Sequence, residues 1–465
     1  MIRMTLREVA DAVGGHLIRN GASLPIEGIS TDSRTLQPGE LFVPLRGEHY
    51  DGHEFLGQAA SHGAVACLSE QAIGGLTIPV IQVKDTLRAL GDLASRVRQS
   101  LAGPLVAITG SSGKTTCKEM LSAILARTAP GLKSLGNFNN LVGVPLSLFP
   151  LRDDHRWAVI EMGMSARGEI ARLTEIAAPQ IGIITNVGAA HLESLGGISG
   201  VAVAKGELYI HLPPGGVAII NADDPEVRQL PVANGVSRRS FGLAASADVR
   251  AEAIEADNGT VRFMLCCEGS RTAVSLPLPG RHNVANALAA VAAARVLDVP
   301  LAEIVAGLES FRPCPGRMEL IELAEDIVIL DDTYNANPLS VRAALDALHD
   351  LGRPGQRIAV LGDMLELGVS ARELHEEIGQ VAAGQVDRLL TCGPQARAIA
   401  DGARLAGFDP QKVASFTSHA ELVETLAALL SPGDRVLVKG SRGMRMEQVI
   451  SLLCAGMQGR AALDG

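Results

Sequence analysis

The first part of the chain alternates short apolar runs with stretches that have the spacing of a helix. The runs at 41–45, 64–68 and 78–83 predict strands. Residues 85–101 carry apolar side chains at helical spacing and are expected to lead into the next part. Residues 1–100 therefore predict a small α/β domain.

From residue 105 the pattern changes to longer repeats of strand, turn and helix. Each strand-like run ends in a polar or glycine turn, and the runs lie at 105–108, 158–160, 181–184 and 217–220. This alternation is typical of a parallel sheet with helices on its faces. Residues 240–279 lack a helical period and predict antiparallel strands appended to that sheet. A long helix is expected over 283–297.

A proline-rich segment at 311–316 is a candidate hinge before the last part of the chain. Four further apolar runs follow at 327–330, 358–361, 389–390 and 436–438. Helical segments come after them, for example at 339–351 and 371–383. The pattern predicts a doubly wound, Rossmann-like domain that binds ligands at the carboxyl ends of its strands. We thus expect an α/β protein with three domains at 1–100, 101–312 and 313–465.

Composition narrows the classes of function. The net charge is −10 and no dense basic run occurs, which argues against nucleic-acid binding. The seven cysteines include the neighbours Cys266 and Cys267 but no C-x-x-C pair, which favours a reducing compartment. The first residues lack a signal-peptide pattern, and Asn286 and Arg295 interrupt the alanine-rich segment 284–297. We expect a soluble protein that stays inside the cell, without membrane insertion.

The strongest local motif is GSSGKTT, between the predicted strand at 105–108 and a helical segment at 118–125. Such a loop turns its backbone N–H groups towards phosphate oxygens, and the following helix adds positive potential. Lys114 would reach the terminal phosphates of ATP, and the Thr115 hydroxyl would bind Mg²⁺. The first glycine of the usual pattern is replaced by Ile108, and a glycine turn that only caps a helix is the alternative. The expected nucleotide-binding residues are Gly110, Ser111, Ser112, Gly113, Lys114, Thr115 and Thr116.

Three further residues follow successive strands of the same predicted sheet. Glu161 ends the run at 158–160, His191 follows the run at 181–184, and Lys205 lies in a segment expected to be helical. Singly, the glutamate could be a solvated charge, the histidine structural and the lysine a surface residue. Their placement after strands of one sheet favours a role beside the phosphate loop.

Longer motifs resemble the Mur ligases, ATP-dependent enzymes that build the peptide of the peptidoglycan precursor. The motifs stand in family order over nearly the whole chain. They are SLGNFNNLVGVPLSL (134–148), EMGMSARGEI (161–170), ITNVGAAHLESLG (184–196), AKGELY (204–209), LPGRHNVANALAA (278–290) and PGRME (315–319).

Within the family, other motifs resemble the member that adds D-alanyl-D-alanine to UDP-N-acetylmuramoyl-tripeptide. They include TDSR (31–34), DDTYNANP (331–338), LGDMLELG (361–368) and KGSRGMRME (439–447). The D-N-P-[RA] motif expected of the diaminopimelate- or lysine-adding relative is missing. The resemblance implies amide ligation through an acyl phosphate, with ATP and Mg²⁺, and a monomer is expected. Whether residue three of the stem peptide is diaminopimelate or lysine stays open.

The resemblance also implies roles for individual residues. Thr115, Glu161, His191 and Lys205 would bind Mg²⁺, Lys205 as a carbamate. The catalytic set would be Lys114, His191, Lys205 and Arg317, with Arg317 on the γ-phosphate. Asn283, Asn286 and Asp331 would contact the nucleotide. The substrates would meet Ser33, Arg34, Asn137, Asn139, Asn140 and Asn335.

Two other functions remain open from the sequence. One is another amide ligase of the same superfamily, with a different amino-acid acceptor or of the folate-polyglutamylating type. The other is a phosphate-loop NTPase that acts as a switch. A switch would need neither a domain for a UDP-sugar nor a further domain that closes on the nucleotide.

Overall fold

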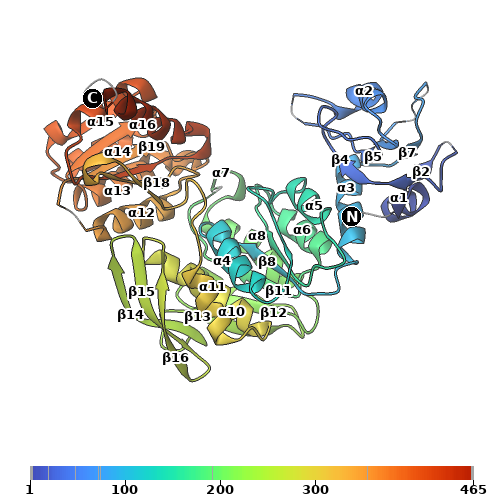
Figure 1. The fold of residues 1–465 in the computed structure, drawn as a ribbon, viewed down its shortest axis with the longest axis horizontal. Coiled ribbons are helices and arrows are strands. Elements are labelled where there is room, and N and C mark those ends of the chain that lie inside the picture. Colours follow the sequence, from blue (N-terminus) through green and yellow to red (C-terminus); the bar gives the residue numbers. More distant parts are fainter. Residues whose placement is uncertain are drawn as a thin grey trace.

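The computed structural model describes residues 4–461 apart from positions 19, 48, 72, 74, 191 and 353, and of 458–461 it describes the backbone. Figure 1 shows three lobes, with the N-terminal and C-terminal lobes standing on opposite ends of the central one. The predicted α/β organisation in three parts is confirmed. In the described part of the chain, no helix is both long and apolar enough to cross a membrane.

The N-terminal lobe is built on a small mixed sheet with strand order β2-β7-β6-β5-β4. The predicted runs correspond to three neighbouring parallel strands, β5 (Glu40–Phe42), β6 (Ala66–Ser69) and β7 (Val80–Gln82). The remaining elements are β1 (Met4–Thr5), α1 (Leu6–Val13), β2 (His16–Leu17), β3 (Pro25–Ile26), β4 (Gly28–Ser30) and α2 (Leu56–Ser61). Thr5 and Glu8 form a capping box that fixes the start of α1.

Helix α3 (Thr86–Arg98) joins the N-terminal lobe to the central lobe and packs against both. The side chain of Asp85 caps its first turn by accepting from Arg88 N at 2.9 Å. At its other end Arg98 is buried, and its guanidinium donates to the carbonyls of Leu101, Ala177 and Ala178 and to the side chain of Gln180. The predicted boundary at residue 100 stays a prediction, and we propose that α3 moves with the central lobe.

The central sheet has nine strands in the described part of the chain, in the order β16-β15-β14-β13-β12-β11-β8-β10-β9. The parallel part consists of β8 (Leu105–Thr109), β9 (Leu132–Lys133), β10 (Ala158–Glu161), β11 (Ile181–Ile184), β12 (Val217–Asn221) and β13 (Ser237–Gly242). The antiparallel strands β14 (Val249–Asp257), β15 (Thr260–Cys267) and β16 (Ser270–Leu276) extend it, as predicted. The sequence pattern missed that β13 begins at Ser237 and that its pairing with β14 is parallel.

Helices cover both faces of the central sheet because its strands are apolar on both sides. Val106 and Ile108 face one apolar cluster, whereas Leu105 and Ala107 face another. The first face is covered by α4 (Lys114–Ala126), α10 (His282–Val296) and α11 (Leu301–Glu309). The second is covered by α3, α5 (Gly143–Leu148), α6 (Glu169–Ala177) and α8 (Ile198–Ile210). Short helices α7 (Leu192–Leu195) and α9 (Pro225–Gln229) lie in the connections.

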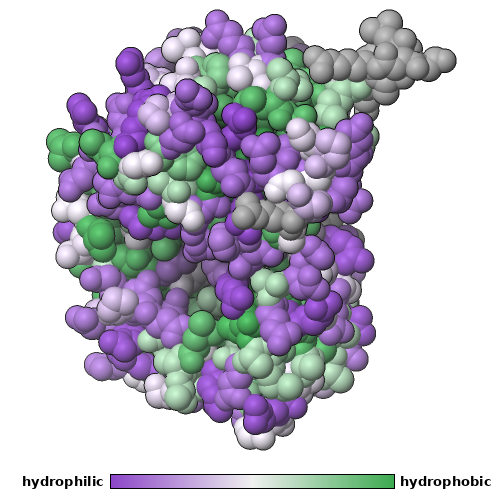
Figure 2. Space-filling view, turned by 90° about the vertical axis from the view of Figure 1, so that its left-hand side faces the viewer, coloured by the Kyte–Doolittle hydropathy of each residue, from purple (hydrophilic) through white to green (hydrophobic). Residues whose placement is uncertain are grey.

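The C-terminal lobe is doubly wound, as predicted, around a sheet of order β17-β18-β22-β19-β20-β21. Its strands are β17 (Glu319–Glu322), β18 (Val328–Asp332), β19 (Arg357–Gly362), β20 (Arg388–Cys392), β21 (Val413–Phe416) and β22 (Arg435–Lys439), and β17 alone of these runs antiparallel. Helices α12 (Pro338–Asp350), α13 (Ala371–Ala383) and α14 (Arg397–Leu405) cover one face, and α15 (His419–Leu429) and α16 (Glu447–Ala461) the other. Figure 2 shows the outer side of this lobe, where hydrophilic side chains surround separate hydrophobic patches.

We expect Arg98→Met to lower the free energy of unfolding by roughly 2–3 kcal/mol, because buried carbonyls at the end of α6 would lose their donors. Urea denaturation followed by circular dichroism measures the change. Arg96→Met is the matched control, since Arg96 is exposed on the same helix and should cost less than about 0.5 kcal/mol. Equal stability of the two variants would show that Arg98 does not hold α3 in place.

Candidate active site

A cavity of about 460 Å³ lies where the central and C-terminal lobes meet. It brings together residues from distant parts of the sequence. The predicted site residues that line it are Ser111, Ser112, Gly113, Lys114, Thr115, Thr116, Asn137, Asn139, Asn140, Glu161, Lys205, Asn283, Asn286, Arg317 and Asn335.

The remaining predicted residues lie elsewhere. Gly110 does not line the cavity, and its carbonyl accepts a hydrogen bond from Lys114. Asp331 does not line the cavity, and its carboxylate accepts from the backbone N–H and the hydroxyl of Thr333, at 3.0 and 2.6 Å. His191 is outside the described residues, so its predicted role stays a prediction.

The loop at residues 110–116, which we call the phosphate-type loop, requires glycine at two positions. Gly113 has φ +80°, and a Cβ there would lie 2.2 Å from Asn286 Oδ1. A Cβ on Gly110, with φ +151°, would lie 1.9 Å from Thr185 Oγ1. The helix starts at Lys114 and not at residue 118 as predicted, so the N–H groups of its first turn, which have no partner within the helix, lie at the loop. Ile108 is a buried residue of β8, so the loop needs no glycine there.

Glu161 connects the loop to the neighbouring strand. Its Oε2 accepts from Thr115 Oγ1 at 2.7 Å, its Oε1 accepts from Asn139 Nδ2 at 2.8 Å, and its own N–H donates to Ser134 Oγ at 2.8 Å. The reading of Glu161 as a solvated charge is therefore wrong, because the side chain is buried. A carboxylate beside a threonine hydroxyl is the oxygen donor set that Mg²⁺ takes. Among the described residues, no three His, Cys, Asp or Glu side chains form a metal-binding group.

Buried charges shift one another's protonation in this half of the cavity. Burial alone would raise the pKa of Glu161, but the positive charges of Lys114, Arg317 and Lys118 and the Asn139 hydrogen bond together lower it. The pKa of Lys114 is lowered, first by burial and then by Arg317, against the attraction of Glu161. Lys114 Nζ donates to the Gly110 carbonyl at 2.7 Å, which leaves it at the loop.

Lys205 is the exception among these charges. It lies in α8, is 2% exposed and lines the cavity, so its reading as a surface residue is wrong. Within the part of the chain that the structure describes, its ammonium has no ion pair. Burial, followed by repulsion from Lys114, lowers its pKa well below the usual range for lysine. The direction of this shift favours the uncharged amine over the ammonium, and an uncharged amine is nucleophilic.

The C-terminal lobe adds cations and an aromatic ring that the sequence did not single out. Lys439, at the end of β22, pairs with Asp332 and donates to the Asn335 carbonyl at 2.8 Å. The guanidinium of Arg317 stacks on the Tyr334 ring at 3.9 Å from its centroid, and that of Arg442 lies 5.7 Å from the same centroid. Arg317 had been predicted, whereas Tyr334 in DDTYNANP and Lys439 and Arg442 in KGSRGMRME had not, and their positions at or after strand ends were the available signal.

Asn337 joins the two lobes at the cavity. It caps α12 through a capping box with Ser340, and its Nδ2 donates to the Ser111 carbonyl at 3.2 Å. The loop that follows β18 is thereby tied to the phosphate-type loop.

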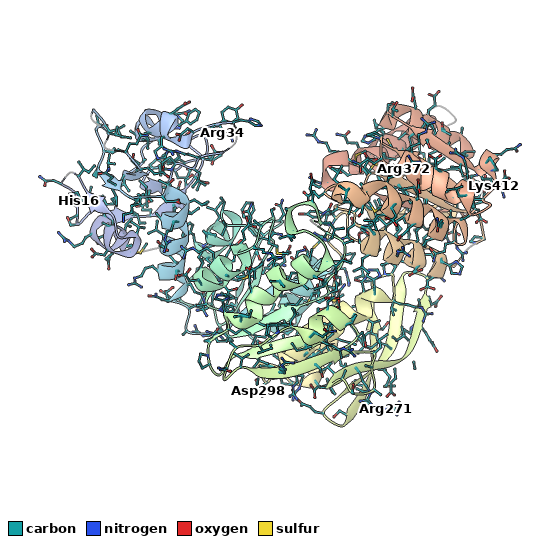
Figure 3. The ribbon with its side chains drawn as sticks, turned by 180° about the vertical axis from the view of Figure 1, so that it is seen from behind. His16, Arg34, Arg271, Asp298, Arg372 and Lys412 are labelled. Atoms are coloured by element: carbon teal, nitrogen blue, oxygen red, sulfur yellow. The ribbon has the colours of Figure 1, made fainter. Side chains whose placement is uncertain are left out.

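Ser33 and Arg34 lie in the N-terminal lobe and not in this cavity. Ser33 Oγ donates to Gln58 Oε1 at 3.0 Å. Arg34 forms a bidentate pair with Asp32, and these hydrogen bonds lower the pKa of Asp32 to about 2. In Figure 3, Arg34 lies on the side of its lobe that faces the C-terminal lobe, so it is directed towards the space between them.

Family models match three successive parts of the chain. "Mur ligase family, catalytic domain" matches residues 25–98, "Mur ligase middle domain" matches 108–294, and "Mur ligase, glutamate ligase domain" matches 316–442.

Relatives match over almost the full chain. UDP-N-acetylmuramoyl-tripeptide–D-alanyl-D-alanine ligase of Escherichia coli is 40% identical over 457 residues, covering 97% of this chain and 99% of the relative. The ligase of the same name from Bacillus subtilis is 36% identical over 454 residues, covering 97% and 98%.

Solved structures show the same architecture. MurF from Acinetobacter baumannii is 37% identical with a TM-score of 0.91, covering 98% of this chain and 99% of that one. MurF ligase from Thermotoga maritima in complex with ADP is 29% identical with a TM-score of 0.84, covering 93% and 98%. Folylpolyglutamate synthase of Mycobacterium tuberculosis is 19% identical with a TM-score of 0.61, covering 77% and 92%, and shares the fold alone.

We expect Gly113→Ala to weaken ATP binding by roughly tenfold or more, because the added Cβ would collide with Asn286 and the left-handed backbone would be strained. Isothermal titration with ATP and Mg²⁺ measures the affinity. Gly57→Ala, in the exposed helix α2 with open space around its Cβ, is the matched control and should bind normally. Unchanged binding by Gly113→Ala would exclude this loop as the nucleotide site.

Proposed function

Because the chain belongs to the Mur ligase family, we propose that it joins D-alanyl-D-alanine to UDP-N-acetylmuramoyl-tripeptide with hydrolysis of ATP to ADP and phosphate. The product would be the pentapeptide precursor of peptidoglycan. The observation that carries the proposal is the cavity where the phosphate-type loop meets Arg317 and Asn335 of the C-terminal lobe. The ligases of this name match the chain over 97% of its length, whereas the folylpolyglutamate synthase resembles it only in fold.

The proposed reaction begins with the terminal carboxylate of the tripeptide. A carboxylate is a poor acyl donor, so its oxygen attacks the γ-phosphorus of ATP and ADP leaves, which gives an acyl phosphate. The ammonium of Lys114 and the guanidinium of Arg317 offset the negative charge that gathers between the two anions. The dipeptide amine then attacks the acyl carbon, loses a proton and expels inorganic phosphate, and the amide bond remains.

Thr115 and Glu161 would hold Mg²⁺, since their oxygens already lie 2.7 Å apart at the phosphate-type loop. Bound there, Mg²⁺ neutralises phosphate charge. We further propose that the uncharged Lys205 amine adds CO₂ to form a carbamate and releases a proton. The carbamate would be a second anionic oxygen ligand, whereas an ammonium at this place would repel the metal. His191 is retained as a proposed ligand on the resemblance alone.

The remaining contacts follow the substrate from end to end. Asn283 and Asn286 lie on the phosphate-loop side of the cavity, where they would contact the nucleotide, and Asn286 Nδ2 donates to Asn283 Oδ1 at 2.9 Å. Asn137, Asn139 and Asn140 would line the path of the tripeptide, and Ser33 and Arg34 would meet its UDP end. We retain a monomer as the proposed working unit on the resemblance alone. Since the reaction consumes ATP, we propose that it takes place in the bacterial cytoplasm.

We expect phosphate release from ATP to require both UDP-N-acetylmuramoyl-tripeptide and D-alanyl-D-alanine. Phosphate is measured with each substrate omitted in turn, and the product is identified by mass as the tripeptide plus one dipeptide. If a different amino acid supports phosphate release in place of the dipeptide, the chain is an amide ligase of the same family with a different acceptor. Steady hydrolysis that ignores every acceptor would contradict the ligase function and support a switch.

We expect Lys205→Arg to lose at least roughly 100-fold in kcat, because arginine keeps a cation and cannot form the carbamate. With ¹³C-labelled bicarbonate, the unsubstituted enzyme should show a carbamate carbonyl signal in its NMR spectrum that Lys205→Arg lacks. Lys133→Arg is the control, since Lys133 is partly exposed and paired with Glu119. A normal turnover rate in Lys205→Arg, or the same NMR signal in both proteins, would contradict carbamylation.

A further inference from the structure

The acceptor dipeptide carries a carboxylate, and the proposed site must also bind the phosphates of ATP and the carboxylate of the tripeptide. Its amine must reach the acyl phosphate, while its carboxylate lies at the other end of the molecule and needs its own cation. The basic side chains lining the described cavity are Lys114, Lys205, His282, Arg317, Lys439 and Arg442. One of these cationic groups therefore has to bind the carboxylate of the dipeptide, in addition to those that bind ATP.

Most of these groups are committed or uncharged. Lys114 bonds within the phosphate-type loop, and burial lowers the pKa of Lys205 well below the usual range for lysine. Lys439 is buried and paired with Asp332. His282 is buried too, and burial lowers its pKa to about 4, so it is neutral. Arg317 is close enough to the loop that its charge lowers the pKa of both Lys114 and Glu161. Arg442 lies farther from the Tyr334 ring than Arg317, at 5.7 Å against 3.9 Å from its centroid.

Arg442 is well placed to meet a ligand from the solvent side. It lies in the turn after β22, and its side chain is 62% exposed. One guanidinium nitrogen, Nη1, contacts Glu447 at 3.2 Å, and the other donors remain for a second carboxylate. Its backbone N–H donates to Asn335 Oδ1 at 3.3 Å, which ties this turn to the loop after β18.

Asn335 supplies a second donor beside Arg442. Its Oδ1 accepts from the N–H groups of Ala336 and Arg442, which fixes the amide so that Nδ2 points the other way. Among the described residues, no protein group accepts from this Nδ2, although the residue lines the cavity. An amide N–H next to a guanidinium is a pair of donors that suits a carboxylate.

We propose that Arg442 and Asn335 bind the terminal carboxylate of the acceptor dipeptide, and that Tyr334 positions Arg442 and Arg317 on one ring so that carboxylate and phosphate are held apart. This assignment rests on the proposed function and adds to it a site for the acceptor. Arg317, at 3.9 Å from the ring centroid, serves the phosphate side, and Arg442, at 5.7 Å, serves the carboxylate side.

The test pairs one substitution with one change in the substrate. D-Alanyl-D-alaninamide keeps the amine of the dipeptide but lacks the carboxylate. In the unsubstituted enzyme we expect the amide to have a KM roughly 10- to 100-fold above that of the dipeptide, as expected for loss of a charge-assisted hydrogen bond. In Arg442→Gln the KM of the dipeptide should rise by a similar factor, and the difference between the two substrates should nearly vanish. The KM of ATP should stay unchanged.

Arg445→Gln is the matched control, because Arg445 follows in the same turn, is exposed and does not line the cavity. It should keep the discrimination of the unsubstituted enzyme. Equal use of dipeptide and amide by the unsubstituted enzyme would overturn the assignment. So would undiminished discrimination in Arg442→Gln, or a change confined to the KM of ATP. If the unsubstituted enzyme forms no product from the dipeptide, the proposed function itself fails, and that outcome is distinct from the others.

Discussion

One buried carboxylate, Glu161, holds together the central-lobe side of the cavity. Burying an ionised group is costly unless opposite charges and hydrogen bonds compensate it. Here Lys114 and Thr115 at the phosphate-type loop and Asn139 in the segment before α5 do so. Glu161 attracts the Lys114 ammonium, whereas burial and repulsion from Lys114 lower the pKa of Lys205 well below the usual range for lysine.

The order of the strands places these groups at one edge of the central sheet. In the central sheet β8 lies between β10 and β11, so the loop after β8, Glu161 at the end of β10 and Thr185 after β11 end at the same edge. The C-terminal lobe repeats this logic, since Asp332 and Lys439 are partners in the register of β18 and β22. The two carboxyl edges face the same cavity, so the proposed phosphate chemistry and acceptor binding would be shared between the lobes.

The buried strands and long helices could be predicted from the sequence because their apolar runs are continuous. The missed strands are short or polar. β9 has two residues, β17 is Glu-Leu-Ile-Glu at an edge, and β21 is only partly buried. Local propensity carries little information in such segments, because tertiary pairing decides their structure.

Site residues that lie in recognisable motifs could be predicted from the sequence. Contacts that depend on the register of paired strands could not. Asp331 and Asp332 are adjacent in β18, so their side chains leave opposite faces of the strand. The sequence could not show which of them faces the cavity, and the residue chosen, Asp331, turns towards Thr333. The pair of Asp332 with Lys439 spans more than a hundred positions and follows from strand register alone. The role of Tyr334 likewise could not be predicted, because it depends on Arg317 and Arg442 lying on its ring in the folded lobe. Because the arginines that meet there come from opposite ends of the C-terminal lobe's sequence, their spacing depends on the folded lobe, and a substrate that needs both can bind only after that lobe has formed.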